Sequence, residues 1–285
     1  MDLLSSLIQG LLTGTIYGLV GMGLAISFGV QGLIDIVNPA VVILAAYLAF
    51  QLAEWFGVDP LLAVLVTMPA LFVLGALIQR LSIRPIIRRP EMVGALMLFG
   101  LALVVENGMV AIWGVDYRSL ASPYRDVAFH LGAISVPLTR LISLGAVLAL
   151  AGILFLFFTR TYLGRAIRAT YMDRDSAELL GINTLRIDWV TYALGTALAA
   201  VAGAIVGLSF VFYPAAVLPW IVLAFAVVII GGRGSIRGTL VAGLLIGFLE
   251  SLTTTLFAAS WMPVATYGAL ILTLVIRPAG LFRQT

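Results

Sequence analysis

Long apolar runs, separated by short polar or Pro- and Gly-containing connections, follow one another along almost the whole chain. The runs are continuous and about 20 residues long, which suits helices that cross a bilayer, and they lack the alternation of barrel strands. The pattern predicts an all-α polytopic membrane protein with about nine spans, in a range of about eight to ten. The predicted spans are 3–29, 38–56, 61–81, 92–114, 141–159, 189–212, 218–230, 238–257 and 262–276.

The spans are expected to form a single transmembrane domain over residues 1–285, without an internal repeat or a separate extramembrane domain. The seventh span is short and lies between Pro219 and a glycine pair, so a re-entrant or broken helix also fits it. The first run lacks a basic start and is longer than a signal-peptide core, so we expect it to be retained as a span. Gly10, Gly14 and Gly18 recur every four residues in this run and predict close helix packing.

The composition supports a lipid environment, since 62% of the residues are hydrophobic and only 10% are charged, against about a quarter in soluble domains. The chain has no cysteine and one histidine, His130, which excludes disulfides, thiolate chemistry and a Cys- or His-cluster metal site. The net charge of +3 does not indicate nucleic acid as a partner, because the basic residues lie in short connections between apolar runs.

The basic residues are all arginine, and they concentrate on alternate connections. By the positive-inside rule, this predicts an N-terminus outside and a C-terminus in the cytoplasm. The arginines assigned to the inside are Arg80, Arg84, Arg88, Arg89, Arg160, Arg165, Arg168, Arg174, Arg186, Arg233, Arg237, Arg277 and Arg283, whereas Arg118, Arg125 and Arg140 fall outside with Asp126.

Two connections are long. The outer one, 115–140, contains tyrosines, prolines and mixed charges, which suit a structural cap at the membrane surface or a contact surface for an extracellular partner. The inner one, 160–188, contains five arginines. Asp173, Asp175 and Ser176 favour the start of one short helix there, which Gly181 and Asn183 end. The residues expected to face the protein are Leu163, Ile167, Tyr171, Ala177, Leu180 and Ile182. A basic anchor that only sets topology is the alternative for this segment.

Within this inner connection, GRAIRATYMDRDSAELLGIN resembles the cytoplasmic coupling segment of permeases in the branched-chain amino-acid family of ABC importers, and is most similar to the H-type subunit. Further similar stretches follow in order along the chain. They are TGTIYGLVGMGLAISFGVQGLIDIVNPA, RPIIRRP, AVVIIGGRGSIRGTLVAGLLIGFLE and LVIRPAGLF.

The resemblance implies a permease subunit in a bacterial inner membrane. Its expected partners are a second and different permease chain, two ATPase subunits, an extracellular substrate-binding protein and membrane lipid. ATP and Mg²⁺ would bind the ATPase subunits, because this chain has no GxxxxGK motif, no lysine and no expected cofactor of its own. The positions that the resemblance assigns to ATPase coupling are Gly164, Arg165, Arg168, Asp173, Ala177, Leu180, Gly181 and Ile182.

Polar groups at depth in a membrane are costly, so they are candidates for lining a translocation path. The candidates are Tyr17, Asn38, Glu106, Asn107, Glu250, Gly231 and Gly232, of which Glu106 does not match the family. For each polar side chain the alternative is an interhelical hydrogen bond that fixes packing.

The cargo is not determined by this resemblance. The residues after Asn38 are Pro39, Ala40, Val41 and Val42, where the family tends to have a polar residue and a glycine, and Arg237 replaces a family proline. A branched-chain amino acid, another amino acid, urea or a short amide, and an organic acid all remain open. The main rival function is an ion-coupled transporter or channel, which should carry several intramembrane charges. A membrane enzyme lacks a catalytic constellation, and a purely structural membrane subunit stays open.

Overall fold

The computed structural model describes residues 3–86, 89–122, 124, 127–131, 134–232, 234–278 and 280–282. Arg88, Arg125, Asp126, Arg233 and Arg283, which the sequence assigned to one side or the other, lie outside this range. The side chain of His130 is also outside what is described.

The described part of the chain contains nine helices that are long and apolar enough to cross a membrane. This confirms the predicted all-α membrane architecture. The helices are α1 (Leu3–Gln31), α2 (Val37–Phe56), α3 (Pro60–Ile78), α4 (Glu91–Trp113), α5 (Leu138–Arg160), α8 (Thr184–Ser209), α9 (Val217–Gly231), α10 (Ile236–Leu256) and α11 (Met262–Ile276). A π-helical turn, Gln79–Ile83, extends α3, and 3₁₀ turns, Pro214–Ala216 and Ala259–Trp261, precede α9 and α11.

Two boundaries differ from the sequence prediction in an informative way. The seventh span is continuous, because the turn Pro214–Ala216 leads directly into α9 and brings this span to 18 residues. The sixth span begins at Thr184 and not at residue 189. Its start is set by Asn183, whose side-chain oxygen accepts a hydrogen bond from the Arg186 amide at 3.1 Å, as expected of an N-cap.

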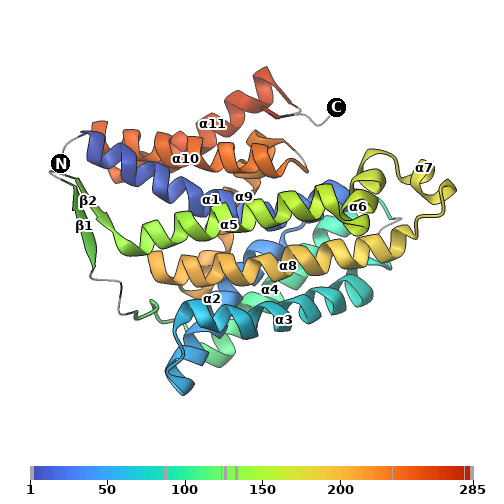
Figure 1. Cartoon of the computed structure of the whole chain (residues 1–285), viewed down its shortest axis with the longest axis horizontal. Helices are drawn as coiled ribbons and strands as arrows, with labels where there is room; N and C mark the ends of the chain where they lie inside the picture. Colours follow the sequence, from blue (N-terminus) through green and yellow to red (C-terminus); the bar gives the residue numbers. More distant parts are fainter. Residues whose placement is uncertain are drawn as a thin grey trace.

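The long helices run side by side, with two short helices at one end of the molecule and a hairpin at the other (Figure 1). The N-terminus lies at the hairpin end and the C-terminus towards the opposite end. We call the end with the short helices the inner end, following the predicted orientation. Most of α1 and α8 is buried, whereas α4, α5 and α11 bury few of their side chains. The core therefore lies around α1 and α8.

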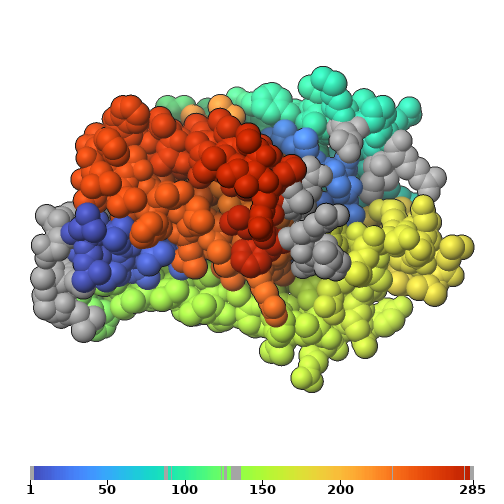
Figure 2. Space-filling view, turned by 90° about the horizontal axis from the view of Figure 1, so that it is seen from above, coloured from blue at the N-terminus to red at the C-terminus, as the bar shows by residue number. Residues whose placement is uncertain are grey.

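Helices α1 and α10 touch through their backbones. A Cβ added to Gly14 would lie 2.5 Å from the Gly243 oxygen, and one added to Gly247 would lie 2.4 Å from the Gly10 oxygen. The predicted glycine packing of α1 is confirmed, and its partner is α10. Viewed from above, α10 and α11, in orange to red, lie beside α5, in green, and α1, in blue, reaches the surface near its start (Figure 2).

The outer connection contains a short antiparallel hairpin, β1 (Ala128–Leu131) and β2 (Ile134–Pro137). Before it, Arg118 exchanges backbone hydrogen bonds with Phe212 at 2.8 and 2.9 Å, and the buried Leu120 donates its amide to the Gly207 oxygen at 3.0 Å. The segment thus covers the outer end of α8, which fits the structural cap predicted for it. The hairpin itself was not predicted.

Candidate functional site

The inner connection folds into two helices, α6 (Tyr162–Met172) and α7 (Arg174–Leu179). The sequence prediction of one short helix was therefore incomplete, because it missed α6. Thr161 begins α6 by accepting the Gly164 amide hydrogen bond at 3.0 Å. The charged positions 165 and 168 lie on one face of α6, and Ala166 and Ile167 lie buried on the other. This helical alternation of charged and apolar positions is the signal that could have identified α6.

Asp173 begins α7 and Gly181 follows its end as the sequence predicted, whereas Asn183, which was expected to help end this helix, begins α8. The Asp173 carboxylate accepts hydrogen bonds from the Ser176 amide at 3.1 Å and the Ser176 hydroxyl at 2.5 Å. These bonds lower the pKa of Asp173 below its usual value. Gly181 has a φ of +83°, and the amide of Ile182 reaches back to the Ala177 oxygen at 3.0 Å. This is a glycine C-cap, in which the residue after the helix takes the left-handed conformation.

A partly buried ion pair, which the sequence interpretation missed, joins α7 to α8. The two terminal nitrogens of Arg174 approach the two carboxylate oxygens of Asp188 at 2.7 and 3.2 Å. Asp188 is only 1% exposed, and the hydrogen bond to it raises the pKa of Arg174. Thr184 bridges the two helices further, since it contacts both Arg174 and Glu178. An acidic residue in the first turns of an apolar span was the signal that such a partner exists.

Helix α6 is fixed on α5 and α8 in turn. A Cβ added to Gly164 would lie 2.2 Å from the Phe157 oxygen, so the corner between α5 and α6 requires glycine. Ala166 and Ile167 pack with Ile187 of α8, and Phe157 and Ile182 contact this small cluster. The inner connection is thus joined firmly to the ends of two membrane spans.

Two leucines at the end of α7 point away from this packing. Leu179 is 89% exposed and Leu180 is 81% exposed. Ile167 and Ala177 are buried as predicted, but Leu163 is also exposed. The prediction that Leu163 and Leu180 face the protein was therefore wrong. Leu180 follows the last residue of α7, so the helical spacing that buries Ala177 does not extend to it.

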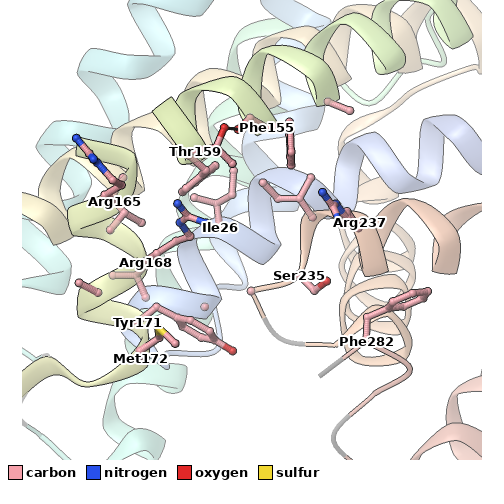
Figure 3. Close-up of a pocket in the computed structure, with 18 of the residues that line it drawn as sticks. Ile26, Phe155, Thr159, Arg165, Arg168, Tyr171, Met172, Ser235, Arg237 and Phe282 are labelled. Atoms are coloured by element: carbon pink, nitrogen blue, oxygen red, sulfur yellow. Dashed lines mark hydrogen bonds between the residues drawn. The ribbon is translucent and has the colours of Figure 1, made fainter. Parts of the chain in front are cut away.

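Arg165 and Arg168 lie on a hollow between α6 and its neighbours (Figure 3). This cavity has a volume of about 1180 Å³ and is bounded by α1, α5, α6 and the start of α10. The structure therefore separates these arginines from Leu179 and Leu180, although the sequence grouped Arg165 and Arg168 with Leu180 as coupling residues.

Glu250 lies in the interior between α1, α10 and α11, with an exposed fraction of 7%. Its carboxylate accepts hydrogen bonds from Tyr17 at 2.8 Å and from Thr266 at 2.5 Å. The Tyr17 ring packs against Phe210 and Trp220, with centroid distances of 6.4 and 6.2 Å. Two of the predicted translocation residues thus contact each other, in an arrangement that ties three helices together.

Asn38 lies elsewhere, in the first turn of α2, and is fully buried. Added Cβ atoms on Gly23 and Gly195 would both contact its side-chain amide, so it is enclosed by α1 and α8. Next to it, the Asp35 carboxylate accepts hydrogen bonds from the amides of Val37 and Asn38 at 3.1 and 3.2 Å and from the Tyr192 hydroxyl at 3.3 Å. The sequence interpretation missed Asp35, although an acidic residue just before an apolar span is a common capping signal.

The remaining translocation candidates are separate from both places. Asn107 is exposed on α4, where its amide donates to the Leu103 oxygen at 2.8 Å, and Glu106 beside it is half-buried. Gly231 and Gly232 are buried at the inner end of α9. A Cβ added to Gly231 would lie 2.6 Å from the Gly238 backbone, and one added to Gly280 would lie 2.5 Å from the Gly232 backbone. Gly231 and Gly232 therefore lie where two backbone segments pack closely.

A comparison with known protein families covers nearly the whole length of the chain. The profile of the family described as "Branched-chain amino acid transport system / permease component" matches residues 6–276. The chain belongs to this family.

Known relatives resemble this permease over most of its length. The high-affinity branched-chain amino acid transport system permease protein BraD of Pseudomonas aeruginosa is 30% identical, over 98% of this chain and 95% of BraD. LivH of Escherichia coli strain K12, with the same description, is 28% identical over 98% of this chain and 94% of LivH. The fructose import permease protein FruG of Bifidobacterium longum is 26% identical over 86% of this chain and 74% of FruG. No solved structure matches the chain.

The family and the nine described spans make this chain a multi-pass permease component of an ATP-driven import system in the inner membrane. Permease components are not themselves ATPases, and they work with other transporter subunits. Among the described residues, no group of three or more His, Cys, Asp or Glu side chains is placed to hold a metal ion.

Proposed function

We propose that this permease forms one half of the translocation path of an importer for an amino acid or a similar small polar solute. An ATPase partner drives it through α6 and α7. The observation that carries this proposal is the exposed pair Leu179 and Leu180 at the end of a helix that is capped at both ends. Exposed apolar side chains outside the membrane are typical of a protein interface.

The inner helices are built to transmit a displacement. The Arg174–Asp188 ion pair joins α7 to α8, and Gly164 lets α6 pack directly on the end of α5. Helix α8 in turn packs against α1, α2 and α3. A movement of the ATPase subunits that pulls on α7 therefore moves α8 and the core helices with it. ATP and Mg²⁺ bind the ATPase subunits in this proposal.

The second half of the path is a second, different permease chain. The supporting observation is Asn107, a polar side chain exposed on α4 within an otherwise apolar face. An amide facing lipid is unfavourable, whereas a partner helix or a polar path satisfies it. Helices α4 and α11, which bury few of their side chains, provide the surface for this partner. Glu250 and Asn38 stay candidates for movements that open the path, because both are buried within this chain.

The cargo is proposed only as a class. BraD and LivH are named for branched-chain amino acids and FruG for fructose, so similarity at this level accompanies different cargoes. The buried, apolar segment 40–42 offers no polar side chain for recognition. We infer that an external substrate-binding protein selects the solute and delivers it to the outer face.

The proposal is tested by the variant Leu179→Asp with Leu180→Asp. Burying an unpaired charge in an apolar interface is strongly unfavourable, so we expect co-purification of the ATPase and ATP-dependent uptake to fall at least about tenfold. Both leucines are exposed, so the purified permease should keep its thermal stability. Leu185→Asp, a half-exposed leucine in the first turn of α8, is the matched control.

Two outcomes would contradict the proposal. One is unchanged ATPase binding and uptake in the double variant. The other is ion-gradient-driven uptake by the wild-type chain without an ATPase, which would instead indicate a secondary transporter.

A further inference from the structure

The hollow at the inner end combines two surfaces of different character. Its wall is apolar and includes Ile26 of α1, Ala151 of α5 and Leu240 of α10. The charged residues that line it are Arg165, Arg168 and Arg237. Figure 3 shows Arg168 on α6 and Arg237 on α10 at opposite sides of the open space.

The three guanidinium groups have no carboxylate in ion-pair distance among the residues that the structure describes, where the printed ion pairs belong to Arg174. Arg237 instead lies over the Phe155 ring, with 4.9 Å between Cζ and the ring centroid. This contact joins the α10 side of the hollow to α5. Within the described part of the chain, the hollow is therefore a positively charged site that no carboxylate neutralises.

The arrangement along the membrane normal matches that of a phospholipid. Arg165 and Arg168 follow the inner end of α5, and Arg237 is in the first turn of α10. Ala151 lies nine residues before the end of α5, which is about 13 Å deeper at 1.5 Å per residue. In the predicted orientation of the spans, the cations are at the level of the headgroups, and the apolar wall extends into the acyl layer.

We propose that this hollow binds an anionic phospholipid of the inner leaflet. Arg168 and Arg237 contact the headgroup phosphate from two sides, and an acyl chain lies along the wall formed by Ile26 and Ala151. Basic pockets between membrane helices on the cytoplasmic side are suited to such headgroups. A free phosphate ion would leave the apolar wall unused, and a neutral lipid would leave the arginines without a counter-charge.

Binding there would connect α6, the longer inner helix, to α10 through a shared headgroup. The lipid would hold α6 against α1 and α10, which are already in backbone contact with each other. An effect of the lipid on transport rests on the proposed function, but the binding site itself does not. The test therefore measures lipid retention alone.

The experiment uses the chain purified in mild detergent with its co-purifying subunits and stripped of lipid. Palmitoyl-oleoyl phosphatidylglycerol or phosphatidylcholine is added, and the retained lipid is counted by native mass spectrometry. We expect one phosphatidylglycerol to be held in preference to phosphatidylcholine. Each of Arg168→Gln and Arg237→Gln should weaken its retention about fivefold, the effect of one arginine near an anionic surface. Arg277→Gln, an exposed arginine on the same side that does not line the hollow, should retain the lipid.

Gly152→Leu provides a test that leaves every charge in place. Gly152 lines the hollow, and a Cβ there would meet no atom within 4 Å, so a leucine has open space at its base and is expected to occupy part of the hollow. We expect the same loss of phosphatidylglycerol, with unchanged thermal stability. This variant decides the matter if the arginine variants fold poorly.

Three results would overturn the proposal. The first is equal phosphatidylglycerol retention by wild type, the arginine variants and Gly152→Leu. The second is displacement of the lipid by millimolar inorganic phosphate, which would indicate a site for a free anion. The third is efficient cross-linking of Gly152→Cys to another protein chain, which would make the hollow a subunit interface.

Discussion

Asp35 is a buried carboxylate in the turn between α1 and α2, where it caps α2. Burial raises its pKa to about 6, although hydrogen bonds from the Asn38 and Val37 amides and from Tyr192 act in the opposite direction. In the unfolded chain an aspartate titrates near pH 3.9. The folded protein therefore binds this proton more tightly, and the stability that results is present below about pH 4 and is lost as the pH rises through 6.

The folded and unfolded pKa values of Asp35 differ by about two units, so its contribution to the free energy of unfolding changes by about 3 kcal/mol over this pH range. We expect Asp35→Asn, which keeps the capping oxygen, to lose this dependence. The difference in Tm between wild type and D35N, measured by scanning fluorimetry in detergent, should change between pH 4 and 6.5 in favour of the variant. Asp59→Asn, at the N-cap of α3, is the control. A difference in Tm that stays constant over this range would contradict the assignment.

Local signals account for the residues that the sequence identified correctly. Asp173 and Gly181 act within a few positions of themselves, through an N-cap and a left-handed C-cap, so their roles are readable from composition and spacing. The partners of Glu250 and Arg174 depend on packing between separate helices, as the bond from Tyr17 to Glu250 shows. Such pairings are tertiary, and a single sequence does not specify which side chains meet.

At the scale of elements, long apolar runs predicted the spans because a membrane helix needs little more than length and hydrophobicity. The same criterion missed α6, because the charged positions 165 and 168 interrupt the run of apolar residues along the sequence. It also missed the hairpin of β1 and β2, whose short strands carry too weak a pattern. The glycine spacing in α1 indicated close contact with another helix, but only the structure shows that this helix is α10, which packs against α1 through Gly243 and Gly247.

The α1–α10 contact has a direct test in Gly14→Ala. The added methyl group would lie 2.5 Å from the Gly243 oxygen and 2.7 Å from the Leu244 Cα, so the two backbones must separate. Overpacking of this kind costs about 1–3 kcal/mol, and we expect a lower Tm and a lower yield of folded permease. Gly145→Ala on α5 is the matched control, since nothing lies within 4 Å of its added Cβ. Equal stability of the two variants would show that the helices adapt freely.

At the scale of the whole molecule, the exposed surfaces divide into three kinds. The end of α7 is exposed beyond the membrane-spanning helices, the hollow beside α6 is basic, and α4 exposes a polar residue among apolar ones. Each kind suits a different neighbour, namely an ATPase, a lipid and a second permease. The division explains why Arg168 and Leu180, which are close in sequence, need not share a partner.

The exposed surface of α4 allows a test of subunit assembly by site-specific cross-linking. Because the chain has no native cysteine, a single introduced cysteine is its only site of labelling. A single cysteine in place of Asn107, labelled with benzophenone maleimide and irradiated in membranes, should give a covalent adduct with a second permease chain. Leu148→Cys, on the exposed face of α5, should give only lipid adducts, because α5 lies outside the proposed subunit contact. The adducts are identified by mass spectrometry of the excised bands. If position 107 reacts only with lipid while position 148 captures a protein, the subunits meet through α5, and Asn107 is exposed to the bilayer for a reason other than assembly.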